Sequence, residues 1–189
     1  MREAEIRAAA LEEFVRRGYE ATTMADIGAA VGMRGPSLYK HVSSKQDLLA
    51  SLMHTTMTAL LHHHDEAVSG VDDPVQRLRR AVDAHVRFHA RHRREAFVGN
   101  RELRSLVEPH RSTILGLRDT YEQRFRALIT DGVARGAFRV ADPQLASYAI
   151  LDLGMGVAVW FREDAGPSEN EVAWAQVEFA LRLVGAATT

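Results

Sequence analysis

The sequence reads as a succession of helical segments whose ends carry helix-starting or helix-stopping residues. No stretch alternates apolar and polar residues over several positions, whereas apolar residues recur at spacings of three and four throughout. Thr23 and Ser44 each precede an aspartate by three residues, and Ser168 precedes Glu171 in the same way, which is typical of a capped helix N-terminus. Gly18 follows a basic helical run, as expected where a helix ends. We therefore expect an all-α fold.

Two further helix starts combine an aspartate cap with proline, at Asp73-Pro74 and Asp142-Pro143. Together these signals predict about nine helices. The expected helices span residues 3–17, 24–31, 35–42, 45–67, 74–94, 96–106, 109–135, 143–162 and 169–184.

Composition excludes several classes of protein. The chain of 189 residues has no cysteine, which excludes disulfides, thiolate metal sites and a cysteine nucleophile. The longest nearly apolar run, residues 148–161, contains Asp152 and is shorter than the ~20 apolar residues that cross a bilayer. With no basic-then-apolar leader, we expect a soluble cytoplasmic protein without membrane contact. Because the formal net charge is -1, nucleic-acid binding would have to come from local charge.

Two very short predicted helices, residues 24–31 and 35–42, follow the first helix. They are joined by a turn that contains Gly32, which is typical of a helix-turn-helix unit. Such a unit is too small to be stable alone. Ile27 and Leu38 can pack against Phe14 of the first helix, so we expect three helices around one small core.

The outer face of the second short helix is basic. Leu38 and Val42 are four residues apart and face inward, which leaves the polar positions outside. Residues 33–45 carry three formal positive charges and no acid, and both lysines of the chain, Lys40 and Lys45, lie there. A helix fits the major groove, and basic side chains with hydroxyls fix its position on the phosphates. This segment therefore favours binding to double-stranded DNA.

Three segments carry a resemblance to a known family: GYEATTMADI at residues 18–27, VG at residues 31–32 and SLYKHVSSKQDLL at residues 37–49. They resemble the DNA-binding domain of TetR-family transcriptional regulators. The resemblance implies a helix-turn-helix domain at residues 1–46 and a helical effector-binding and dimerisation domain at residues 47–189. One departure is Arg34, which stands where the family often has a serine cap.

The resemblance also implies roles for individual side chains. Phosphate contacts are implied for Thr22, Thr23, Tyr39 and Lys45. Contacts to base edges are implied for Arg34, Ser37, Lys40 and His41. Two alternatives stay open, since Tyr39 could pack on the domain surface and Lys45 could be a solvated side chain of a first helical turn.

The last two predicted helices, residues 143–162 and 169–184, are apolar on two sides. One side of each can belong to the domain core, and the other then needs a partner. We expect these helices to pair with their copies in a homodimer, which would present two recognition helices to a palindromic operator. A monomer with both helices fully buried is the alternative. The residues expected at the dimer interface are Leu151, Val159, Trp174, Val177, Leu181 and Val184.

An apolar stripe on the predicted helix 109–135 is either plain core or one wall of an effector pocket. Residues 100–106, 119–122 and 154–162 resemble, more weakly, TetR regulators of fatty-acid or sterol acyl-CoA breakdown, which implies an apolar effector, with an acyl-CoA as one candidate. The residues expected to line the pocket are Phe97, Asn100, Arg101, Arg104, Leu117, Tyr121, Phe125, Met155, Trp160 and Arg162.

Catalytic and metal-dependent functions have little support. No nucleotide-binding glycine loop, HExxH motif or spacing of a nucleophile with its base is present. His85, His89 and His92 share one helix face at a spacing that can bind zinc, but arginines crowd the segment, so we expect neither a metal site nor a cofactor. The expected function is a ligand-responsive repressor. The alternatives are a helical interaction protein without DNA binding and, less favoured, a helical enzyme.

Overall fold

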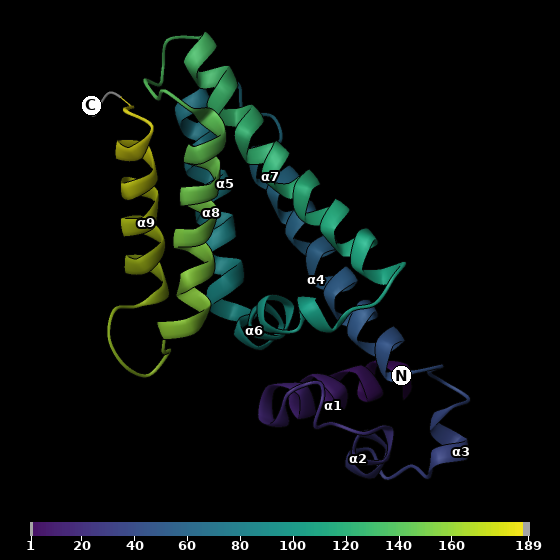
Figure 1. Ribbon diagram of the computed structural model, residues 1–189. Coiled ribbons are helices and arrows are strands. Elements are labelled where there is room, and N and C mark those ends of the chain that lie inside the picture. The colour runs from purple at the N-terminus through teal and green to yellow at the C-terminus, as the bar shows by residue number, and fades with distance from the viewer. Residues whose placement is uncertain (1, 187–189) are drawn as a thin grey trace. The chain divides into compact units, whose positions relative to one another are not determined.

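The computed structural model describes residues 2–186 and is built from helices, with no β-strand in that range beyond one isolated bridge between Arg162 and Ala165 (Figure 1). This confirms the expected all-α class. The helices are α1 (Arg2–Arg17), α2 (Met24–Ala30), α3 (Gly35–Leu38), α4 (Lys45–Val68), α5 (Pro74–Arg91), α6 (Arg93–Arg101), the 3-10 turn η1 (Leu103–Ser105), α7 (His110–Ala134), α8 (Pro143–Trp160) and α9 (Glu169–Leu183).

The helix starts are formed by the predicted caps. Thr23 and Ser168 each make a reciprocal capping box, in which the hydroxyl accepts from the third helical amide and the carboxylate there accepts from the cap amide. The carboxylates of Asp73 and Asp142 accept from amides in the first turns of α5 and α8. The sequence prediction of these four starts is therefore confirmed.

Two predicted helices are shorter in the structure. The helix expected at residues 35–42 is regular only over α3, because its amides then bond at mixed spacing: His41 N–H and Val42 N–H both donate to the Leu38 carbonyl, at 2.9 and 3.2 Å. No side chain caps its start at Arg34. The helix expected at residues 96–106 is α6 followed by the separate turn η1, with Glu102 between them.

The chain forms two compact units. The first, called the head unit below, comprises the chain up to Met57 together with residues 94–117. The second, called the effector unit, comprises residues 58–93 and the chain from Arg118 onward. The predicted division at residues 46 and 47 followed the motif alone, whereas the head unit also contains α6, η1 and the start of α7.

The head unit has its own hydrophobic core. Ile6, Phe14, Ile27 and Leu38, from α1, α2 and α3, are fully buried, as expected for a three-helix arrangement. Leu48 and Leu49 of α4 belong to the same cluster. It is completed by Val98, Leu106 and Ile114, which come from residues 94–117 of the same unit. Burying each of these side chains stabilises the unit by about 1.5–3 kcal/mol.

The effector unit is organised around α5, against which α8 and α9 both pack (Figure 1). Phe125 and Ile129 of α7 and Ile150 and Val157 of α8 are almost completely buried. The apolar stripe of α7 is thus largely core. Within the described residues, no helix is both long and apolar enough to cross a membrane.

Candidate nucleic-acid interface

The turn between α2 and α3 is fixed by two glycines. Gly32 has a φ of +66°, a left-handed conformation that side chains disfavour. The Met33 amide donates to the Gly28 carbonyl at 2.8 Å, so the chain turns back closely over α2. A Cβ at Gly28 would lie 2.8 Å from the Met33 carbonyl oxygen. These two glycines set the direction in which α3 leaves the turn.

One side chain anchors α3 and its neighbours face solvent. Leu38 is fully buried, whereas Arg34, Ser37 and Lys40 are exposed. His41 is exposed too, and the Tyr39 ring is 56% exposed and does not pack into the domain core. These five side chains therefore lie on an accessible, basic surface, as DNA recognition requires. They are the four implied to contact base edges and Tyr39, which is implied to contact a phosphate.

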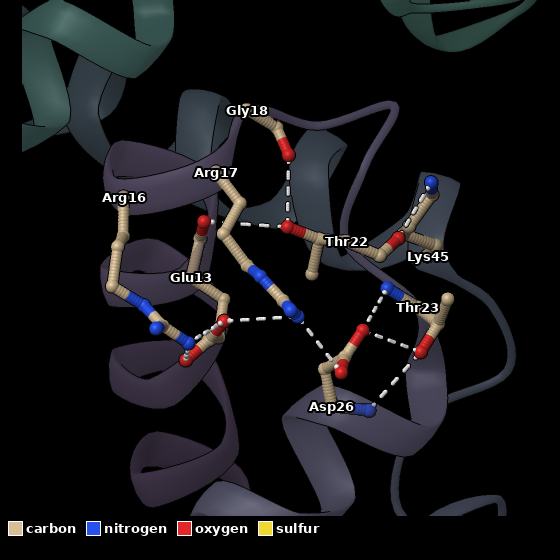
Figure 2. Close-up of polar contacts among 8 residues, drawn as sticks. All are labelled: Glu13, Arg16, Arg17, Gly18, Thr22, Thr23, Asp26 and Lys45. Atoms are coloured by element: carbon tan, nitrogen blue, oxygen red, sulfur yellow. Dashed lines mark hydrogen bonds and ion pairs between the residues drawn. The ribbon is translucent and has the colours of Figure 1, made fainter.

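A polar network joins the end of α1 to the start of α2 (Figure 2). The largely buried Glu13 carboxylate binds Arg16 at 2.7 Å, and Arg17 contacts both Glu13 and Asp26, at 3.9 and 2.8 Å. Hydrogen bonds from Thr23 and the nearby Arg17 guanidinium lower the pKa of Asp26 to about 2. Asp26 is thus charged at neutral pH and fixes the start of α2.

The two threonines assigned to phosphates differ in the structure. Thr22 is 0% exposed, and its hydroxyl donates to the carbonyls of Gly18 and Glu13, at 2.8 and 3.3 Å. The prediction that this side chain contacts a phosphate is therefore wrong, because the hydroxyl is enclosed and already bonded (Figure 2). Thr23 is exposed, but its hydroxyl donates to Asp26 at 2.6 Å as the cap of α2.

Lys45 is also occupied inside the head unit. Its ammonium donates to the carbonyls of Tyr19 and Thr22, both at 2.8 Å, and lies 4.1 Å from the centre of the Tyr19 ring. Two of its three protons are therefore used in holding the loop between α1 and α2 against the first turn of α4. This arrangement favours a structural role for Lys45, and its predicted phosphate contact remains a prediction.

The sequence analysis did not identify Gln46, which links the helix-turn-helix to residues 105–107 of the same unit. Its side-chain amide donates to the Tyr19 hydroxyl and to the Ser105 carbonyl, both at 2.7 Å, and its oxygen accepts from the Val107 amide at 3.2 Å. The buried Glu102 carboxylate accepts from the Tyr19 amide at 3.3 Å. No local pattern signals these contacts, because the partners are far apart in the sequence.

Comparison with known proteins identifies this architecture. Residues 6–52 match the family model described as bacterial regulatory proteins, tetR family. Residues 71–184 match the model described as tetracyclin repressor-like, C-terminal domain, and this match alone spans more than half of the chain. The chain belongs to the TetR family. It is therefore a transcriptional regulator with a DNA-binding helix-turn-helix and not an enzyme.

Individual TetR-family relatives agree over nearly the whole length. A tetR-family regulatory protein from Rhodococcus RHA1 superposes with a TM-score of 0.93 at 35% identity, covering 98% of both chains. The transcriptional repressor KstR2 of Rhodococcus jostii is 28% identical over 85% of this chain and 79% of its own length. AibR, solved with isovaleryl coenzyme A and operator DNA, shares the fold with a TM-score of 0.88 at 23% identity, covering 99% of this chain and 100% of its own.

The residues predicted to line the effector pocket divide between the two units of this TetR-family protein. Phe97, Asn100, Arg101, Arg104 and Leu117 belong to the head unit. Arg101 and Arg104 line a groove beside Gly18 in that unit. Tyr121, Phe125, Met155, Trp160 and Arg162 belong to the effector unit. Neither unit contains all of the predicted pocket residues. That these residues line one pocket stays a prediction.

Tyr121 and Phe125 lie in a buried cluster with histidines. The His85 ring donates from Nε2 to the Leu151 carbonyl at 3.1 Å, so in the neutral ring Nδ1 accepts from the Tyr121 hydroxyl at 2.9 Å. His89 donates to the His85 carbonyl at 2.9 Å. Burial lowers the pKa of both histidines. Of the three histidines in the predicted stripe, His85 and His89 are thus part of the core of the effector unit, whereas His92 follows α5 and is half-buried.

The predicted dimer face of α9 needs correction. Val177, Leu181 and Val184 are buried within the effector unit, because this side of α9 packs on α5. The prediction that these three residues meet a second copy is therefore wrong. Of the other predicted interface residues, Leu151 is half-buried and Val159 is 73% exposed, while Trp174 is exposed at one edge of α9.

Proposed function

We propose that this TetR-family protein is a repressor that binds a near-palindromic operator as a homodimer and is released by an apolar effector of the acyl-CoA class. The observation that carries the DNA-binding part is the exposed basic surface around α3, with Leu38 as its buried anchor. Repression is supported by the likeness to KstR2 of Rhodococcus jostii, a transcriptional repressor. Such a regulator acts on DNA in the cytoplasm.

The homodimer is supported by the apolar side of α8 that faces away from α5. Val159, Leu153, Tyr148 and Leu145 are large and exposed there, and Phe179 adds an exposed ring on α9. Several large apolar side chains left exposed along one side of a helix are typical of a protein–protein interface. We infer that α8 and the Phe179 side of α9 pair with the same helices of a second copy. Twofold pairing would bring two reading surfaces, meaning the exposed basic side of α3 with Arg34, Lys40 and His41 in each copy, to one operator.

The effector class is supported by sequence and by fold. The segments that resemble regulators of acyl-CoA breakdown include Met155 and Trp160 on α8. AibR shows that this fold can combine operator recognition with binding of a coenzyme A thioester. Release follows if the thioester binds better to a conformer with another spacing of the reading surfaces, because DNA and effector then lower each other's affinity by the same factor.

An electrophoretic shift assay tests this function. Purified protein is titrated against fragments of the DNA that flanks its gene, at two salt concentrations, with and without acyl-CoA thioesters of graded chain length. Salt-sensitive binding to a short palindrome, reversed by a thioester, is the expected result. Absence of binding to every genomic fragment would instead support a helical interaction protein that does not bind DNA.

A further inference from the structure

The effector unit carries a groove that neither DNA reading nor the inferred dimer face uses. It has a volume of about 540 Å³ and lies between the end of α4, the middle of α5 and the start of α9. The side chains that matter for its chemistry are Arg79, Arg80, Arg87, Asp83, Asn170 and Trp174. Its volume is within the range of about 300–1,000 Å³ that is usual for small-molecule sites.

Two of the three arginines are held in place by ion pairs. Arg79 binds the Glu178 carboxylate at 3.0 Å. Arg87 binds Asp83 at 2.8 Å, Glu169 at 2.9 Å and the Asn170 side-chain oxygen at 2.7 Å. The contact with Arg87 uses the Asn170 side-chain oxygen, so the side-chain nitrogen of this lining residue remains available as a donor. The wall is therefore preorganised.

The third arginine has a different environment. Arg80 is exposed and forms no ion pair or side-chain hydrogen bond among the described residues, 2–186. Glu66 and Asp83 are the acidic residues that line the groove, and Glu178 and Glu169 bind the guanidinium groups of Arg79 and Arg87. Arg79 and Arg87 are thus engaged by carboxylates, whereas the Arg80 guanidinium has no carboxylate within 4 Å among residues 2–186. A guanidinium in this state is suited to a phosphate group, which it can bind with two parallel hydrogen bonds.

An exposed indole stands at the same groove. Trp174 is 64% exposed, although an adjacent position of α9, Ala173, is completely buried. Trp174 and Asn170 are four residues apart and both line the groove, so the indole lies on the α5 side of α9. An exposed aromatic face beside an unpaired guanidinium is an arrangement that can bind a planar base together with a phosphate.

We propose that this groove binds a nucleotide, with its base stacked on Trp174 and its phosphate paired with Arg80. The donor of Asn170 and the guanidinium of Arg79 contact the phosphate oxygens or the sugar. The nucleotide is either a free metabolite or the nucleotide end of coenzyme A, and the chemistry of recognition is the same in both cases. The proposal does not depend on operator binding.

Isothermal titration calorimetry with the full chain tests the proposal. The probes are adenosine diphosphate, adenosine 3′,5′-bisphosphate, coenzyme A and inorganic phosphate, each at up to about 1 mM, where even weak affinities are measurable. We expect Arg80→Ala to weaken nucleotide binding about tenfold, as loss of one charge-assisted contact predicts. Trp174→Ala should weaken it at least about fivefold through loss of stacking.

Matched variants separate this site from general charge effects. Arg182→Ala removes an exposed arginine elsewhere on α9 and should bind all probes like the parent. Arg80→Lys keeps the charge but loses the planar fork, so it should have intermediate affinity. Because Arg80 and Trp174 are exposed, these variants should keep the parent's circular dichroism spectrum.

Each outcome decides the proposal. Tighter binding of coenzyme A than of adenosine diphosphate assigns the groove to a thioester effector, and equal binding assigns it to a free nucleotide. The proposal is overturned if no nucleotide binds, if inorganic phosphate binds as tightly as the nucleotides, or if Arg80→Ala binds like the parent. If nucleotides bind through Arg80 but an acyl-CoA releases the operator equally from parent and Arg80→Ala, the groove takes a free nucleotide and the proposed function stands.

Discussion

The ammonium group of Lys45 donates a hydrogen bond of 2.8 Å to the carbonyl oxygen of Tyr19 and lies 4.1 Å from the centre of that residue's ring. The contact joins the first turn of α4 to the loop that precedes α2. From the sequence alone, a lysine at this position of the motif is interpreted as a phosphate contact. In the structure its charge stabilises the loop that supports the reading surface, and this difference can be measured.

Replacing Lys45 with methionine should lower the free energy of unfolding by about 1–3 kcal/mol, since two carbonyls lose a charged donor. Urea unfolding followed by circular dichroism measures this change. Lys45→Arg, which keeps the charge and several donors, should recover part of the stability. If Lys45→Met unfolds like the parent but shows a smaller salt dependence of DNA binding, Lys45 contacts a phosphate instead.

Lys40 should behave in the opposite way. It is exposed beside α3, so Lys40→Ala should leave the unfolding free energy within about 0.5 kcal/mol of the parent. Its operator affinity should fall, and the slope of log affinity against log salt should shrink by about one unit if the ammonium contacts a phosphate. Fluorescence anisotropy with labelled operator at several salt concentrations gives this slope. An equal slope for Lys40→Ala and for Arg182→Ala, a control in the effector unit, would exclude that contact.

Two glycines of α8 make a matched pair. A Cβ on Gly154 would lie 2.1 Å from Cδ2 of His85, whose ring is held between the Tyr121 hydroxyl and the Leu151 carbonyl. Gly154→Ala should therefore destabilise the protein by about 1–3 kcal/mol. Gly156 has no atom within 4 Å of its added Cβ, so Gly156→Ala should stabilise by up to about 1 kcal/mol. Thermal unfolding compares the two, and similar effects at both positions would mean that His85 moves aside easily.

The buried histidines predict an acid-sensitive effector unit. Burial lowers the pKa of His64, His85 and His89 below the ordinary value, so the neutral rings are favoured in the folded chain. Of the charged groups near them, the Asp65 carboxylate opposes the shift at His64 and Arg124 adds to it. A depressed histidine pKa gives stability that is complete above about pH 6.5 and is lost as the pH falls below that value, because the unfolded chain takes up the protons.

Urea midpoints at about pH 7.5 and 5.5 test this dependence. The parent should be clearly less stable at the lower pH. His85→Gln removes one titrating ring and should show a smaller pH-dependent loss, despite lower stability at the higher pH. A parent stability that does not change between the two pH values would contradict the burial of these neutral rings.

The inferred dimer predicts which apolar side chains require a second copy. Val159→Glu places a charge in the centre of the proposed interface and should convert the dimer into monomer in light scattering at micromolar concentration. Val107→Glu, a change at another exposed apolar position that lies in the head unit, should leave the mass unchanged. A monomeric parent, or a dimeric Val159→Glu variant, would place the interface elsewhere.

The sequence predicted the helices well because their start signals are local. The hydroxyl of Thr23 and the carboxylate of Asp142 act on amides within the next three residues, so the pattern is visible without tertiary structure. The family motif likewise located the exposed side of α3. Residues that act through long-range contacts were not predictable. Ser105, a hydrogen-bond partner of Gln46, is 59 positions away in the sequence. The Thr22 hydroxyl is enclosed by the carbonyls of Glu13 and Gly18, which no local pattern indicates.

The inward side of α9 shows why amphipathic patterns can mislead. Both sides of this helix are apolar, one through Val177 and Leu181 and the other through Phe179 and Leu183. Periodicity identifies two candidate faces but cannot say which of them meets α5. The packing of α5 decides, and it buries Val177 and Leu181 while leaving Phe179 exposed.

The anchoring of α3 by Leu38 alone has an evolutionary consequence. Selection on protein stability acts on that leucine and on the glycine turn before it, while Arg34, Ser37, Lys40 and His41 are almost exempt from it. Under the proposed base-reading role of these side chains, single substitutions on the solvent side of α3 can change the operator that is bound without loss of stability. The set of regulated genes can change in this way while Leu38 and the glycine turn that hold α3 stay the same.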